Sequence, residues 1–255
     1  MIPRERISQS IRAAAAGGEP ALVAYLTAGY PRRAQFKELV RALADAADVL
    51  EVGVPFTDPM ADGVTIQRAS VAALAQGVTL KWILEELEAL GQLRAPLLLM
   101  SYLNPLLAFG PALAARARRA GVAGFIVPDL PLDESSELRA ALDAEGLALV
   151  QMVTPVTEPQ RLRQLCSGSQ GFVYAVTMTG TTGKNVAVPE DVVRYLDAVR
   201  ALAPVPVCAG FGIRSREQVE RLRGHVDGVV VGSALVEVLE RGEDPQAWLK
   251  GLRGR

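Results

Sequence analysis

The sequence has few of the residues on which many enzymes depend. Its 255 residues include one histidine, His225, and two cysteines, Cys166 and Cys208. The cysteines are far apart, which argues against a disulfide, and the histidine stands outside any cluster of cysteines and acids. A GxSxG motif is missing, and neither cysteine has the histidine nearby in the sequence. We therefore expect neither a metal site nor a triad-type nucleophile.

Lysine is also rare, with four residues in the whole chain. Lys37 and Lys81 fall in predicted outer helices, and Lys250 lies near the C-terminus. Lys184 lies in a predicted loop. A lysine that forms a Schiff base normally projects from a buried strand end, so this chemistry is disfavoured.

Neither excess charge nor a long apolar run is present. The 27 basic and 28 acidic side chains give a net charge of −1, which argues against binding to nucleic acid or to a membrane surface. No apolar run reaches the ~18–20 residues of a membrane span. The first twenty residues predict an amphipathic helix rather than a signal peptide. We expect a cytoplasmic protein.

Short apolar runs alternate with amphipathic helical patterns along the chain. This alternation is typical of βαβ units with a parallel sheet, whose strands are buried on both faces. The predicted strands cover residues 21–27, 49–54, 96–102, 124–127, 148–153, 172–176, 205–209 and 226–231. The predicted helices include residues 35–46, 80–90, 112–120, 135–145, 189–202 and 215–223.

Eight such units predict a (β/α)₈ TIM barrel, a fold of typically ~250 residues. No GxGxxG follows the first strand, so an open dinucleotide-binding sheet has no support. We expect one domain over residues 1–255, with an extra N-terminal helix, Pro3–Ala16, as a plug over the bottom of the barrel. Additional short helices are predicted after strand two, over 66–75, and after strand eight.

Three acids cluster where the second strand ends, in the segment LEVGVPFTDPMADG at 50–63. Glu51 interrupts an apolar strand and points away from the face of Leu50 and Val52. A carboxylate there is costly to desolvate unless it is paired or used. Asp58 and Asp62 follow on the loop. Glu51 is either a structural acid or a catalytic one, and Asp62 lies either in an ordinary turn or in an acid/base pair.

Two tyrosines and three glycine-bearing turns share this end of the predicted barrel. Tyr25 and Tyr174 either pack in the core or line a pocket. The turns at 180–183, 210–212 and 232–233 follow strands six, seven and eight, where such barrels bind phosphate at a helix N-terminus. Each turn taken alone also fits an ordinary loop. The connections over 55–65 and 177–188 are unusually long, which is typical of functional loops.

These features together favour general acid/base chemistry on a phosphate-bearing substrate. Without a metal or a Schiff base, breaking a carbon–carbon bond requires the substrate to supply its own electron sink. An indole ring does so when it is protonated at C3.

Several segments closely resemble the tryptophan synthase alpha subunit family, and the similarity extends along nearly the whole chain. The most specific is LEVGVPFTDPMADGVTIQRAS at 50–70. The others are YLTAGYP at 25–31, MSYLNPLLAFG at 100–110, GFIVPDLP at 124–131, GFGI at 210–213 and VVVGSALV at 229–236.

The resemblance implies a carbon–carbon lyase that splits indole-3-glycerol phosphate into indole and glyceraldehyde 3-phosphate. By motif, Glu51 is the general acid/base, Asp62 holds the indole N–H, and Tyr174 lies beside them. The indole site is lined by Tyr25, Leu99, Phe211 and Val230, and the phosphate is bound by Gly183, Gly212, Gly232 and Ser233.

The resemblance also implies a partner, a beta subunit that carries pyridoxal phosphate and consumes indole in an α₂β₂ heterotetramer. The alpha chain itself carries no cofactor. The expected interface consists of loops at the barrel mouth, including 55–59 and 104–109. Its residues are Pro55, Asp58, Pro59, Asn104, Pro105 and Phe109.

Loop six departs from the family pattern. It reads TMTGTTGKN, with Met178 and Thr181 where the family usually has an arginine and a valine. Thr182 and Gly183 match, so the predicted role of this loop as a closing lid is kept. Two alternatives remain, a related phosphate-binding isomerase or synthase, and a catalytically silent barrel that activates a partner.

Overall fold

The computed structural model describes residues 1–177, 189–210 and 212–253, and it contains a closed parallel barrel with the strand order β1 to β8. The predicted TIM barrel is thereby confirmed. The strands are β1 (Ala21–Thr27), β2 (Val49–Gly53), β3 (Leu97–Met100), β4 (Val122–Ile126), β5 (Ala148–Val153), β6 (Val173–Val176), β7 (Val207–Gly210) and β8 (Gly228–Val231).

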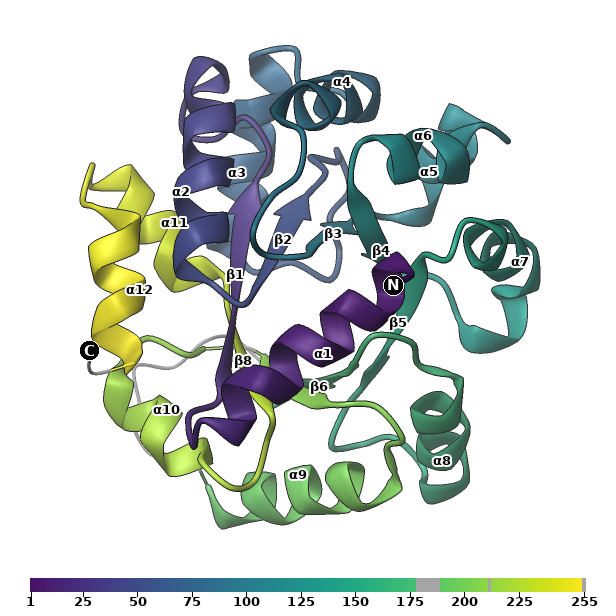
Figure 1. The fold of residues 1–255 in the computed structure, drawn as a ribbon, viewed down its shortest axis with the longest axis vertical. Helices are drawn as coiled ribbons and strands as arrows, with labels where there is room; N and C mark the ends of the chain where they lie inside the picture. The colour runs from purple at the N-terminus through teal and green to yellow at the C-terminus, as the bar shows by residue number, and fades with distance from the viewer. Residues whose placement is uncertain (178–188, 211, 254–255) are drawn as a thin grey trace.

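The helices surround the barrel in Figure 1, except for α1, which crosses one end of it. They are α1 (Pro3–Ala16), α2 (Phe36–Ala46), α3 (Val64–Ala75), α4 (Leu80–Leu90), α5 (Leu103–Phe109), α6 (Leu113–Arg119), α7 (Ser136–Ala144), α8 (Pro159–Gly168), α9 (Glu190–Leu202), α10 (Arg216–Leu222), α11 (Ser233–Glu240) and α12 (Pro245–Arg253). Two 3₁₀ turns, Arg33–Gln35 and Leu132–Glu134, precede α2 and α7. The predicted extra helices after strands two and eight are present as α3 and α11.

Helix α1 fills the N-terminal end of the barrel, as predicted. Its Ile7 and Ile11 are fully buried and belong to the same apolar cluster as Val23, Val49 and Phe172 on the inner face of the strands. Because this end is packed with side chains, the pocket must open at the opposite, C-terminal end.

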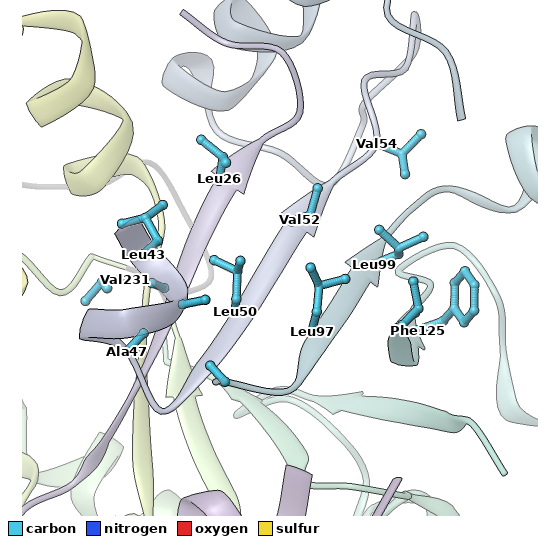
Figure 2. Close-up of a cluster of buried hydrophobic side chains, with 14 of the residues drawn as sticks. Leu26, Leu43, Ala47, Leu50, Val52, Val54, Leu97, Leu99, Phe125 and Val231 are labelled. Carbon is cyan, nitrogen blue, oxygen red and sulfur yellow. The ribbon is translucent and has the colours of Figure 1, made fainter. Parts of the chain in front are cut away.

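A second apolar layer joins the outer faces of the strands to the helices. Figure 2 shows Leu50 and Val52 of β2 in this layer together with Leu97 and Leu99 of β3. Leu43 of α2 packs with them, so this layer holds the helices against the barrel.

Two aspartates that precede strands brace the N-terminal end. Asp48 Oδ2 accepts a 2.8 Å hydrogen bond from the amide of Leu22 on the neighbouring strand. Asp227 Oδ2 accepts an equivalent bond of 2.8 Å from the amide of Val207. Each carboxylate therefore continues the hydrogen bonding between two strands beyond the end of the sheet ladder.

Candidate active site

Glu51 projects into the barrel from β2 and is 1 % exposed. Its Oε2 atom is buried and has no hydrogen-bond partner among the described residues, and no described arginine or lysine forms an ion pair with it. Burial, followed by the charge of Asp62, raises the pKa of Glu51 to about 8. A structural ion pair would lower this pKa, so the geometry favours the catalytic interpretation of Glu51 over the structural one.

Asp62 lies on the connection between β2 and α3 and faces the same pocket. Burial raises its pKa to about 6, and a hydrogen bond with the hydroxyl of Tyr102 opposes the rise. The two carboxyl groups are therefore in different states at neutral pH, with Glu51 mostly protonated and Asp62 mostly ionised. Such a separation of pKa values suits one group to proton donation and the other to charge stabilisation.

The loop that carries Asp62 is held from two sides. The amide of Ala61 donates a 2.9 Å hydrogen bond to the hydroxyl of Tyr102, which follows β3. Gln67 Nε2 on α3 donates a 2.9 Å hydrogen bond to the carbonyl of Asp62. Tyr102 also stacks on Phe56, with 5.2 Å between the ring centroids. The sequence analysis did not identify Tyr102 as a functional residue, although its place at the end of the predicted strand over 96–102 was a usable signal.

Tyr25 and Tyr174 line the pocket, and each is 6 % exposed. Both also belong to clusters of buried apolar residues. Burial raises the pKa of both phenols well above the usual value, which keeps them neutral. Tyr25 shares a 3.1 Å hydrogen bond with Thr27 Oγ1. Two strand-end glycines leave room for the rings, because a methyl group on Gly53 would overlap the phenol of Tyr25 and one on Gly210 the phenol of Tyr174.

Another wall of the pocket combines the turns after β7 and β8. Gly212 has φ of +84°, a left-handed conformation that favours glycine. Gly232 precedes α11, and Ser233 is the first residue of that helix. The amide of Val236 in the first turn donates a hydrogen bond to the carbonyl of Gly232. The first amides of a helix and its dipole suit an anion. The predicted phosphate residues Gly212, Gly232 and Ser233 therefore lie together on one pocket wall.

One pocket includes most of the predicted site. Val230 lines it as predicted, whereas Ile66, Met100, Ile213 and Arg214 line it without having been predicted. Gly183, Thr182 and Phe211 lie outside the described residues. The complete described lining is Tyr25, Glu51, Asp62, Gly63, Ile66, Met100, Tyr174, Gly212, Ile213, Arg214, Val230, Gly232, Ser233 and Ala234.

The prediction that Leu99 lines the pocket is wrong. Strand β3 pairs with β2 so that Leu98 is opposite Glu51 and Met100 is opposite Gly53. Partners in a parallel ladder share a face, so Leu98 and Met100 point into the barrel and Leu99 points outward. Leu99 is fully buried in the layer beneath the helices, and Met100 occupies the pocket position.

The predicted interface residues lie on the two segments that follow β2 and β3. Pro55 is buried, Asp58 is exposed and Pro59 is half-buried. The predicted mouth loop at 104–109 is instead most of helix α5, where Asn104 is exposed and Pro105 and Phe109 are half-buried. Proline is tolerated here because it lies in the first helical turn, where no backbone N–H is needed.

The described part of the chain contains no group of three or more histidine, cysteine or acidic side chains that fits a metal ion. His225 Nδ1 lies 2.8 Å from Asp197 Oδ1, outside the pocket lining. Cys166 and Cys208 are buried free thiols. None of the helices over the described ranges has the length and apolarity needed to cross a bilayer.

Comparison with known proteins gives a consistent result. The family model described as tryptophan synthase alpha chain matches residues 11–252. The alpha chain of Nitratidesulfovibrio vulgaris is 45 % identical over 253 residues, which cover 98 % of each chain. That of Carboxydothermus hydrogenoformans is 43 % identical over 238 residues, covering 92 % of this chain and 89 % of the relative.

Solved structures agree with the sequence relatives. A structure of Mycobacterium tuberculosis tryptophan synthase superimposes with a TM-score of 0.89 at 36 % identity, covering 98 % of this chain and 97 % of the other. Tryptophan synthase subunit alpha from Legionella pneumophila gives a TM-score of 0.86 at 30 % identity, covering 98 % and 97 %. The chain therefore belongs to the tryptophan synthase alpha chain family.

Proposed function

We propose that this chain cleaves indole-3-glycerol phosphate to indole and glyceraldehyde 3-phosphate. The observation that carries the proposal is a pair of carboxyl groups, Glu51 and Asp62, whose pKa values are about 8 and about 6 in one pocket. A retro-aldol reaction on an indole requires a proton donor for C3 and a negative charge near the ring nitrogen. The protonated Glu51 and the ionised Asp62 match these two requirements. Family membership supports the same reaction.

The proposed proton cycle begins and ends with protonated Glu51. Glu51 gives its proton to C3 of the indole, and the ring nitrogen acquires positive charge that ionised Asp62 stabilises. The Glu51 carboxylate then removes the proton of the hydroxyl group on the adjoining carbon. The carbon–carbon bond breaks, its electron pair returns to the ring, and the hydroxyl carbon becomes the aldehyde of the product.

The remaining roles follow from position in the pocket. The wall formed by Gly212, Gly232 and Ser233 is assigned to the phosphate of the substrate. Tyr25, Tyr174 and Val230 pack around the indole, and Met100 takes the role expected of Leu99. Gly183 and Phe211 keep their proposed contacts with phosphate and indole, and Thr182 keeps its lid role, on motif alone.

The direct test measures indole released from indole-3-glycerol phosphate by the wild-type chain and by Glu51→Gln. Loss of a general acid/base is expected to lower the rate by about 10²–10⁴-fold, because no other described group is placed for both proton transfers. Wild-type rates in Glu51→Gln would refute the catalytic assignment. An inactive wild-type chain that still activates a partner would favour the silent-subunit alternative.

The proposed partner is a tryptophan synthase beta subunit, with pyridoxal phosphate bound in that subunit and an α₂β₂ assembly. The expected contact surface follows β2 and β3 and includes Asp58, Pro59 and Asn104. Met60 and Leu107 on the same two segments are 83 % and 65 % exposed, which is unusual for apolar side chains and supports a contact there. Size-exclusion chromatography of the two chains mixed, with Met60→Glu as the variant, tests this surface.

A further inference from the structure

The described residues of the candidate pocket have an unfavourable charge balance for a phosphate ester. Asp62 is mostly ionised at neutral pH, and a phosphate ester brings close to two further negative charges. Among the described residues that line the pocket, Arg214 is the only cation. The amides at the start of α11 offer a partial positive charge of about half an elementary charge, which does not balance a dianion.

Arg214 is anchored close to the phosphate wall. It lies two residues after Gly212, in the connection between β7 and α10. Its amide donates a 2.7 Å hydrogen bond to Gln218 Oε1, which also takes part in the capping box of α10 with Ser215. The backbone of Arg214 is therefore fixed, while its long side chain retains several rotatable bonds.

The guanidinium of Arg214 is bound to the carboxylate of Glu237 on α11. Nη1 donates to Oε2 at 2.6 Å, and Nη2 donates to Oε1 at 2.9 Å. Glu237 lies one helical turn after Ser233 on α11. The guanidinium of Arg214 is therefore bound by a carboxylate that lies one helical turn from Ser233, on the wall assigned to the phosphate.

This ion pair is suited to exchange. The side chains of Arg214 and Glu237 are 41 % and 27 % exposed, so the pair is solvated and contributes little to stability. A guanidinium donates to a phosphate through the same two-pronged geometry that it uses for a carboxylate. Transfer of the guanidinium from Glu237 to the phosphate therefore replaces one bidentate contact with another.

We propose that Arg214 is a phosphate ligand of this pocket, and that Glu237 holds its guanidinium while the pocket is empty. The inference rests on the proposed function in one respect, that the substrate is a phosphate ester. It adds a charged side chain to a phosphate wall otherwise formed by glycines, Ser233 and the N-terminus of α11.

Calorimetric titration with glycerol 3-phosphate, and separately with indole, tests the proposal in the full-length chain. Arg214→Gln is expected to weaken glycerol 3-phosphate binding by about tenfold or more, with indole binding unchanged. Glu237→Gln is expected to leave phosphate affinity unchanged or to raise it by about two- to fivefold, because it removes the competitor for the guanidinium. Arg221→Gln is the matched control, since Arg221 pairs with Glu217 at 2.7 Å on α10 and does not line the pocket.

A similar loss of phosphate affinity in Arg214→Gln and Glu237→Gln would mean that the ion pair only braces the two segments, and would overturn the proposal. Wild-type affinity in Arg214→Gln would overturn it as well. The proposed function is judged separately, by indole release from indole-3-glycerol phosphate in the wild type. An inactive wild type that binds glycerol 3-phosphate through Arg214 would reject the function and keep the ligand assignment.

Discussion

The hydroxyl of Tyr102 accepts a 2.9 Å hydrogen bond from the amide of Ala61, which precedes Asp62. A side chain that follows β3 thereby fixes a loop that follows β2. The same hydroxyl is hydrogen-bonded to Asp62 and lowers the pKa of that carboxyl against the effect of burial. Tyr102 therefore controls both the position and the ionisation of an acid that the proposed reaction requires.

Replacing Tyr102 with phenylalanine is expected to raise the pKa of Asp62, because the opposing hydrogen bond is lost while burial remains. The acidic limb of the kcat profile should move to higher pH, with a loss of about three- to tenfold in rate near pH 6. Steady-state indole release measured across pH checks this. A uniform loss of rate at every pH, with no movement of the limb, would contradict the role of Tyr102 in ionisation.

The pH profile of the wild-type chain is expected to be bell-shaped. Activity should fall below about pH 6, where Asp62 becomes protonated, and above about pH 8, where Glu51 loses its proton. In Asp62→Asn the acidic limb should disappear along with most of the rate. The measurement is kcat/KM for indole-3-glycerol phosphate between about pH 5 and pH 9. A flat profile over this range would count against both assignments.

Because of Glu51, the free energy of unfolding is expected to decrease as pH rises. The folded protein keeps the proton of Glu51 up to about pH 8, whereas the unfolded chain loses it near the ordinary pKa of 4.5. The native state thus binds more protons than the unfolded state over this interval, so stability is highest below pH 4.5 and declines toward pH 8 as far as Glu51 is concerned.

Glu51→Gln removes this dependence and should be more stable than the wild type at pH 8, by on the order of 2–5 kcal/mol. The difference should shrink as pH is lowered toward 5. Urea unfolding of both proteins at several pH values gives the comparison. A stability difference independent of pH would show that Glu51 does not retain its proton in the folded state.

Adding a methyl group at Gly53 is expected to displace Tyr25 from the pocket. The new Cβ would overlap the phenol, so the ring has to turn or the strand has to shift. We expect Gly53→Ala to lose activity by at least about tenfold and to lose about 1–3 kcal/mol of stability. Gly251→Ala on α12 is the matched control, since a methyl group there meets no atom within 4 Å. Equal activity in the two variants would contradict the steric argument.

The aspartate braces at the closed end are expected to affect stability without affecting catalysis. Asp227→Ala leaves the amide of Val207 without its 2.8 Å acceptor and should cost about 1–3 kcal/mol. Asp45→Ala on the exposed side of α2 is the control and should be neutral. Chemical denaturation and indole release measured on the same samples separate the two effects. Loss of specific activity in folded Asp227→Ala would be the contrary result.

The inner and outer faces of β2 were predictable because Glu51 is the only polar residue in an otherwise apolar strand. Its position shows which alternate side chains point into the barrel. Strand β3 reads LLLM and contains no polar residue, so either face was compatible with Leu99. Only the pairing of Gly53 with Met100 determines which side chains enter the pocket. The error at Leu99 is therefore a shift of one residue, which in a strand reverses the face.

Contacts between distant segments were harder to predict than strand-end residues. The capping box of Ser215 and Gln218 is local in sequence, because the two residues are three positions apart at the start of one helix. The hydrogen bond between Ala61 and Tyr102, and the ion pair between Arg214 and Glu237, depend on the spatial order of strands and helices. Residues 104–109 were predicted as part of a mouth loop on the family resemblance, whereas they belong to helix α5, in which Pro105 lies in the first turn, where proline is tolerated.

Ile7 and Ile11 of α1 close the N-terminal end of the barrel. When a substrate is split into two products inside the barrel, neither product can leave through that end. Both products must therefore leave through the C-terminal opening. A protein bound over that opening would lie on the exit path of both products.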